Sequence, residues 1–203
     1  MVALQGGVEI VAQLTETMLA PMLIGRDPFH VRGLWDEMFW QTQILGRTGA
    51  NRIAMSGVDI ALWDLNARAL SVPLWKLLGG TGATRIPLYS TNAGWLSFPQ
   101  DVMIAKMHAV LAEGFHGVKM KIGSPDPRAD LRRVAAVRES IGPDVPLMLD
   151  PFHYYSREES LYIAKELEYL EYYWMEEPMD EHSMSSYVWL CENTRLPICG
   201  PET

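Results

Sequence analysis

The sequence has little cysteine, no long apolar run and no excess of basic charge. Its two cysteines, Cys191 and Cys199, are too few for a disulfide framework and fit a reducing compartment. No Cys/His cluster with the spacing of zinc ligands is present. Neither a disulfide framework nor a zinc site is therefore expected.

Membrane and nucleic-acid partners are also not expected. No stretch approaches the roughly 18 uninterrupted apolar residues of a membrane span, and no basic-then-apolar leader opens the chain. The formal net charge of -8 argues against binding to a nucleic-acid backbone, which requires clustered Lys and Arg. We therefore expect a cytoplasmic protein, and its 48% hydrophobic content is ample for a folded core.

The first part of the chain reads as helical. Apolar residues recur at helical spacing over residues 8–23, 28–45 and 53–70. A short helical turn follows in the segment SVPLWKLLGG and ends at its two glycines. Trp35, Trp40 and Trp63 are expected to pack in the core of this helical part.

From residue 86 the pattern changes to short strands that alternate with helices. Strands that alternate with helices of this length predict a parallel sheet in an α/β fold. We place the domain boundary near residues 80–86. The predicted strands are 86–91, 117–122, 145–150, 172–177 and 196–201, and the predicted helices are 99–113, 127–140, 156–170 and 183–193.

Five βα strands are too few to close a (β/α) barrel, which needs eight. The sheet is therefore either an open doubly wound sheet or part of a larger barrel. The sequence also ends shortly after the last predicted strand, with no helix to cover it, although such a strand is normally covered. We therefore expect a partial polypeptide.

Five charged residues follow the strand candidates at near-regular intervals: Lys119, Lys121, Asp150, Glu176 and Glu202. Each lies in or at the end of a short apolar run, which places it at the tip of one of four consecutive parallel strands. Because such tips meet at one edge of a sheet, the three carboxylates would converge on a site for a hard divalent cation. Oxygen ligands of this kind favour Mg²⁺ over the soft metals.

The two lysines are two residues apart, so a strand points both ammonium groups to the same side. Each ammonium disfavours protonation of the other, which favours the use of one lysine as a base. The alternatives are a solvated strand end for the lysines and a helix N-cap or loop position for each acid. In the doublet Glu176–Glu177 only one side chain can face inward. The equal spacing selects Glu176, and Glu177 is expected to point outward to a structural partner.

Five segments together carry a resemblance to a known family: GVDIALWDLNARALSVPLWKLLGG at 57–80, GVKMKIG at 117–123, MLD at 148–150, MEEP at 175–178 and the Glu of CGPE at 199–202. This set resembles the enolase superfamily, specifically the mandelate racemase/muconate lactonizing enzyme family. The resemblance implies a capping domain followed by a modified (β/α) TIM-type barrel. Residues 1–82 would be the helical portion of the capping domain, and residues 83–203 the N-terminal part of the barrel, with about five strands.

The resemblance also implies roles for the charged residues. Asp150, Glu176 and Glu202 look like the Mg²⁺ ligands. Lys121 looks like the base that removes the proton α to a substrate carboxylate, as a Lys or His base does in enolase-superfamily sites. Lys119 would favour the neutral form of Lys121 and help to bind the carboxylate.

The implied reaction is Mg²⁺-dependent proton abstraction to an enediolate, with dehydration of a sugar acid to a 2-keto-3-deoxy acid favoured. His153 is a candidate acid toward the leaving hydroxide, although many family members carry Asn at the position of Phe152. A loop histidine without a catalytic task, a racemase, epimerase or cycloisomerase, a catalytically inactive barrel fragment and an open binding domain stay as alternatives. The implied partner is a small-molecule carboxylate, and a homo-oligomer is expected.

Overall fold

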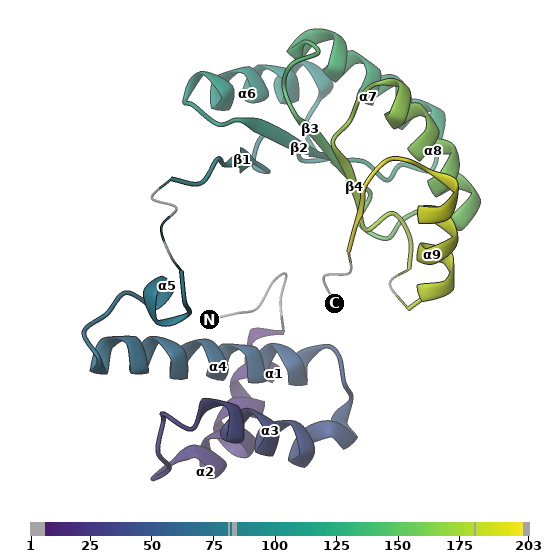
Figure 1. The fold of residues 1–203 in the computed structure, drawn as a ribbon. Coiled ribbons are helices and arrows are strands. Elements are labelled where there is room, and N and C mark those ends of the chain that lie inside the picture. The colour runs from purple at the N-terminus through teal and green to yellow at the C-terminus, as the bar shows by residue number, and fades with distance from the viewer. Residues whose placement is uncertain (1–6, 81, 83–84, 181, 201–203) are drawn as a thin grey trace. The chain divides into compact units, whose positions relative to one another are not determined.

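The chain forms two compact units, divided after residue 84, in a computed structural model (Figure 1). The structure describes residues 7–80, 82, 85–180 and 182–200. Within these ranges no helix combines the length and the apolar character needed to cross a membrane.

The first unit is helical. A continuous helical run over residues 8–23 contains a π-helical segment, and the long helix predicted from residue 53 begins three residues earlier, at Ala50. The predicted helical regions are therefore confirmed. The elements are α1 (Val8–Leu14), η1 (Thr15–Leu19), α2 (Ala20–Leu23), α3 (Val31–Thr42), η2 (Gln43–Leu45), α4 (Ala50–Ala69) and α5 (Leu74–Leu77).

The core of this unit contains one face of α3 and one face of α4. Leu34 and Met38 are buried from α3, and Met55 is buried from α4. The prediction that Trp40 packs in the core is wrong, because its side chain is 61% exposed. Two residues of helix rotate a side chain by about 200°, so Trp40 points away from the face that Met38 buries.

The second unit is a five-stranded parallel sheet whose strands follow one another in chain order (Figure 1). The predicted parallel α/β arrangement is therefore confirmed, and helices α6 to α9 lie together on the outer side of the sheet. The strands are β1 (Tyr89–Ser90), β2 (Gly117–Lys121), β3 (Leu147–Asp150), β4 (Trp174–Glu176) and β5 (Ile198–Cys199). The helices are α6 (Gln100–Ala112), α7 (Pro127–Ile141), α8 (Arg157–Tyr169) and α9 (Met184–Asn193).

The helix starts are encoded locally. Asp126 caps α7 by accepting a hydrogen bond from the Arg128 backbone N–H, and Pro127 occupies the first helical position, where its missing N–H is not needed. Ser156 and Glu159 form a reciprocal capping box at the start of α8. These caps fix where each loop that follows a strand must end.

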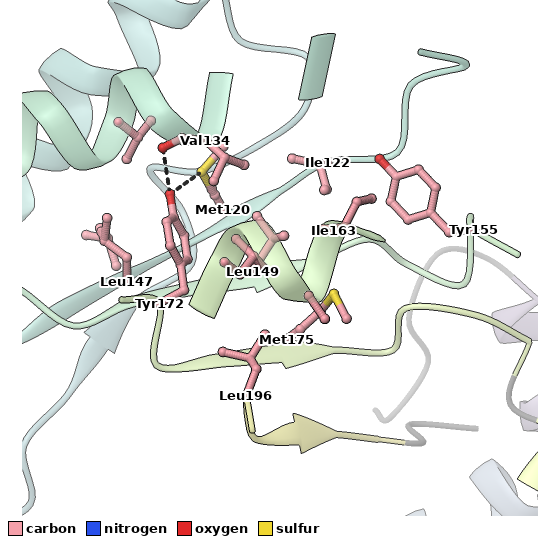
Figure 2. Packing of buried hydrophobic residues seen from close by; sticks show 14 of the residues in the cluster. Met120, Ile122, Val134, Leu147, Leu149, Tyr155, Ile163, Tyr172, Met175 and Leu196 are labelled. Carbon is pink, nitrogen blue, oxygen red and sulfur yellow. Dashed lines mark hydrogen bonds between the residues drawn. The ribbon is translucent and has the colours of Figure 1, made fainter. Parts of the chain in front are cut away.

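The helices bury one face of the sheet in a large apolar core (Figure 2). Met120, Leu149 and Met175 reach this core from three neighbouring strands, and each is at most 1% exposed. The Tyr172 hydroxyl donates a hydrogen bond of 3.0 Å to the Val134 carbonyl within the same core (Figure 2). Because side chains alternate along a strand, the residues between these apolar ones point to the opposite face.

Candidate metal and proton-transfer site

The two predicted lysines lie on the face of β2 opposite the apolar core. Val118 and Met120 are buried in that core, so strand alternation turns Lys119 and Lys121 to the other side. Lys119 is 8% exposed, whereas Lys121 is only partly buried. An ammonium as buried as that of Lys119 requires nearby negative charge.

Asp150 and Glu176 supply that charge from the ends of β3 and β4. Asp150 Oδ2 lies 2.6 Å from Lys121 Nζ and 3.2 Å from Lys119 Nζ. Glu176 Oε1 lies 2.5 Å from Lys119 Nζ. Strand register explains this convergence, because Lys121 pairs directly with Asp150 across β2 and β3. The structure thus brings four predicted residues into one charged cluster, while Glu202 lies outside the described residues.

Burial and charge act in opposite directions at Lys119. Burial alone would lower the pKa of Lys119, but the hydrogen bonds and negative charges of Glu176 and Asp150 outweigh it, and the pKa is raised above its usual value. Burial also raises the pKa of the Cys199 thiol, and the Glu176 carboxylate raises it further against the opposing effect of Lys119. Cys199 therefore remains a neutral thiol beside the cluster, and the carboxylates are its anionic donors.

The donor atoms suit a hard cation. The carboxylates of Asp150 and Glu176 both contact the Lys119 ammonium, so a positive charge already lies between these two groups of oxygen atoms. Oxygen donors without a thiolate favour Mg²⁺. Along the described part of the chain, no three His, Cys, Asp or Glu side chains are placed to hold a metal ion together. Two of the three predicted ligands are thus adjacent, and the position of the third, Glu202, is not described.

His153 lies in the loop after β3 and contacts the loop after β4. Its Nε2 lies 3.0 Å from Glu177 Oε2, and its Nδ1 lies 3.3 Å from the Met179 carbonyl oxygen. The His153 backbone N–H also donates to the Glu177 carbonyl at 2.7 Å. Glu177 was predicted to serve a structural partner instead of the cation, and its buried carboxylate contacts His153. The pair joins the loops that follow Asp150 and Glu176.

Two aromatic residues beside Lys121 were not predicted to belong to the site. Lys121 Nζ lies 4.8 Å from the ring centroid of Phe152 and 5.7 Å from that of Trp95. Phe152 follows the candidate metal ligand Asp150 by two residues, so its position in the sequence indicates that it lies near the site. Trp95 comes directly after Gly94 in the loop between β1 and α6, and a Gly-Trp pair at such a position is a weak signal.

Two family models match, and together they cover most of the chain. Residues 2–79 match the family described as "Mandelate racemase / muconate lactonizing enzyme, N-terminal domain". Residues 102–203 match the family described as "Enolase C-terminal domain-like". The two matches fall on the helical unit and on the unit that contains the sheet.

Proteins of known name and structure are similar over nearly the whole chain. L-talarate/galactarate dehydratase of Salmonella typhimurium (strain LT2) is 33% identical over 197 residues, which cover 97% of this chain and 49% of that protein. The crystal structure of L-talarate dehydratase from Polaromonas sp. JS666, complexed with Mg and L-glucarate, matches with a TM-score of 0.86 and 33% identity over 96% of this chain and 54% of that one. A racemase from Streptomyces coelicolor A3(2) with bound magnesium matches with a TM-score of 0.90 and 32% identity over 98% and 55% of the two chains.

These matches settle the fold class. The parallel sheet and the enolase C-terminal match confirm the predicted α/β fold with part of a (β/α) TIM-type barrel, preceded by a helical part. The chain spans about half the length of the curated relatives it matches. It belongs to the mandelate racemase/muconate lactonizing enzyme family of the enolase superfamily.

Proposed function

We propose that this chain provides the metal and base side of an enzyme that removes the proton α to a carboxylate with Mg²⁺. The favoured reaction is dehydration of a sugar acid to a 2-keto-3-deoxy acid, the work of a hydro-lyase. The observation that carries the proposal is the convergence of Lys119, Lys121, Asp150 and Glu176 at the ends of adjacent parallel strands. The similar dehydratases of sugar acids support the substrate class.

The proposed Mg²⁺ ligands are Asp150, Glu176 and Glu202. Asp150 and Glu176 are adjacent hard oxygen donors, and the two similar crystal structures contain magnesium. When bound, Mg²⁺ would stabilise the second negative charge that develops on the substrate carboxylate as the α-proton leaves. Lys119 adds positive charge at the same place, because it lies between both carboxylates.

Lys121 is the proposed base. It stands at the outermost position of β2, is partly buried and contacts Asp150, so its Nζ can reach a substrate held at the strand ends. The neutral amine takes the α-proton, and the electrons of the broken C–H bond move into the carboxylate to give an enediolate. Collapse of the enediolate expels the hydroxyl from the β-carbon, and the resulting enol tautomerises to the 2-keto-3-deoxy acid.

His153 is the proposed acid that gives a proton to the leaving hydroxide, which departs as water. Two contacts orient its ring, Nε2 to the buried Glu177 carboxylate and Nδ1 to the Met179 carbonyl oxygen, so proton donation to the hydroxide requires the ring to give up one of them. The second candidate reaction is racemisation or epimerisation, favoured by the similarity to a racemase. That reaction returns a proton to the opposite face of the same enediolate, so it shares Lys121 and the cation.

We also propose residues 1–82 as the helical portion of a capping domain and residues 83–203 as the N-terminal part of the barrel. The positions of the two family matches support this division. The expected homo-oligomer stays a prediction, which sedimentation velocity would test.

The experiment that tests the function follows α-proton exchange. The protein is incubated with galactarate and Mg²⁺ in D₂O, and proton NMR reports loss of the α-proton signal while a carbonyl reagent reports 2-keto product. For the unaltered protein we expect both α-proton exchange and 2-keto product. Lys121→Ala should abolish the exchange and the product, whereas the exposed control Lys165→Ala should change neither of them. Exchange without 2-keto product would replace dehydration by racemisation, and exchange that persists in Lys121→Ala would move the base to another residue.

A further inference from the structure

The ammonium of Lys121 is flanked by two half-exposed aromatic rings. Its Nζ lies 4.8 Å from the ring centroid of Phe152 and 5.7 Å from that of Trp95. Phe152 is 46% exposed and Trp95 is 43% exposed, so each ring has apolar surface available beside the proposed base. Both residues belong to the unit that contains the sheet.

The position of Trp95 is fixed by its backbone. Lys121 N–H donates to the carbonyl oxygen of Gly94 at 2.7 Å, and Arg133 Nη2 donates to the carbonyl oxygen of Trp95 at 3.2 Å. Gly94 packs so closely on β2 that an added Cβ would lie 2.0 Å from the Lys119 carbonyl oxygen. The loop between β1 and α6 is therefore attached directly to the strand that carries the base.

The position of Phe152 is fixed by strain and by one hydrogen bond. Its backbone N–H donates to Asp150 Oδ1 at 3.0 Å, the second oxygen of the carboxylate that contacts Lys121. Its φ of 53° lies in the left-handed region, which a bulky side chain rarely adopts. Such strain persists only where the surrounding structure enforces it, and here it places an aromatic ring at the base.

We propose that Trp95 and Phe152 determine substrate specificity by binding the C–H face of a carbon chain that continues beyond the α-carbon. Pockets for small molecules combine apolar and aromatic walls with a few polar anchors, and here the charged cluster supplies the anchors. The site then prefers long polyhydroxylated acids to acids of two carbons. This inference rests on the proposed function, because it places the substrate carboxylate at the charged cluster.

Ligand binding tests this preference without catalytic turnover. With Mg²⁺ present, saturation of the aromatic protons in a saturation-transfer NMR experiment should transfer to the C–H protons of galactarate. Trp95→Ala and Phe152→Ala should each weaken galactarate binding about tenfold, the effect of losing one or two apolar contacts in a pocket. Binding of glycolate, which has no chain beyond its α-carbon, should change less than twofold.

Two further variants separate contact from structure. Tyr169→Ala removes an 84% exposed ring from the end of α8, and it should leave both ligands bound as in the unaltered protein. Phe152→Leu keeps an apolar side chain, and we expect it to retain most galactarate binding. Both ring variants should keep the thermal midpoint of the unaltered protein within a few degrees, since each ring is half exposed.

The outcomes distinguish two roles of the rings of Trp95 and Phe152: binding of the substrate chain, or stabilisation of the Lys121 ammonium alone. An equal loss of galactarate and glycolate binding would overturn the inference, because the rings would then act only through the Lys121 ammonium by cation–π attraction. Unchanged galactarate binding in both variants would overturn it as well. Selective loss of galactarate binding in a protein that fails to exchange the α-proton would uphold the aromatic contact and refute the proposed reaction.

Discussion

Lys119→Met tests whether one buried ammonium compensates the two carboxylates of the charged cluster. The Lys119 side chain is 9% exposed and that of Asp150 is 4% exposed, so both charges are shielded from water. Breaking a buried ion pair by removing one partner costs about 3–5 kcal/mol. In the variant Asp150 still has Lys121 at 2.6 Å, and Glu176 is 22% exposed, so neither carboxylate is left wholly uncompensated. We therefore expect a loss at the lower end of this range, about 3 kcal/mol in the free energy of unfolding.

The matched control is Lys165→Met, which removes an exposed lysine on α8. Lys165 Nζ lies 3.3 Å from Glu168 and its side chain is 50% exposed, so its removal should cost about 0–1 kcal/mol. Urea unfolding in metal-free buffer, followed by circular dichroism, measures both losses. Hydrogen exchange of the β3 amides then shows whether these stability losses arise in the unit that contains the sheet. If Lys119→Met loses no more than the control, the ammonium does not compensate the carboxylates and the reasoning is refuted.

Added Mg²⁺ separates charge compensation from packing. A ligand that binds only the folded protein stabilises it by about 2.7 kcal/mol at a concentration of a hundred times its Kd. Mg²⁺ should stabilise both proteins, but the two carboxylates of Lys119→Met lack the neighbouring ammonium and should bind it more tightly, so the difference in stability should narrow. An undiminished difference at saturating Mg²⁺ would assign the loss to the aliphatic part of the lysine.

Three further substitutions test other parts of the second unit, each by urea unfolding. Several interactions lower the pKa of Glu168 to about 2, and the largest of them is a hydrogen bond from the Thr194 hydroxyl. The ionised Glu168 carboxylate therefore stabilises the fold above about pH 4.5, and this contribution disappears as the pH falls toward 2. Glu168→Gln should flatten the loss of stability over that range. Gly94→Ala should cost about 1–3 kcal/mol, because its Cβ has no space against β2. Tyr172→Phe should cost about 1 kcal/mol by leaving the buried Val134 carbonyl without its hydroxyl donor.

The elements that could be predicted are those whose signals are local. The observed helix Arg157–Tyr169 lies inside the predicted range 156–170, and its start is set locally by the capping pair Ser156 and Glu159. The first strand was predicted over 86–91, yet only Tyr89–Ser90 forms a ladder. A strand exists only where its partner provides hydrogen bonds, and β1 pairs with β2 over two positions. Its length is therefore a property of the sheet and not of its own residues.

The charged cluster could be predicted for a related reason. Repeated βα units set the spacing of Lys121, Asp150 and Glu176, and strand alternation sets the face on which they lie. The loops could not be predicted in this way. Trp95 reaches Lys121 because a backbone hydrogen bond and the absence of a Cβ at Gly94 hold its loop against β2, and both depend on tertiary contact.

Backbone strain marks the same loops. Five non-glycine residues in the described part of the chain have positive φ, and three of them, Phe152, His153 and Glu177, follow Asp150 and Glu176 directly or within three residues. The other two come just after helix ends, where this conformation is common. Glycine would relieve the strain at all three positions, but it could not provide the ring beside Lys121 or the contact between His153 and Glu177. Strain of about 1–3 kcal/mol at each residue is tolerable only if those side chains are needed where they are, which is why we place substrate recognition and proton donation in these loops.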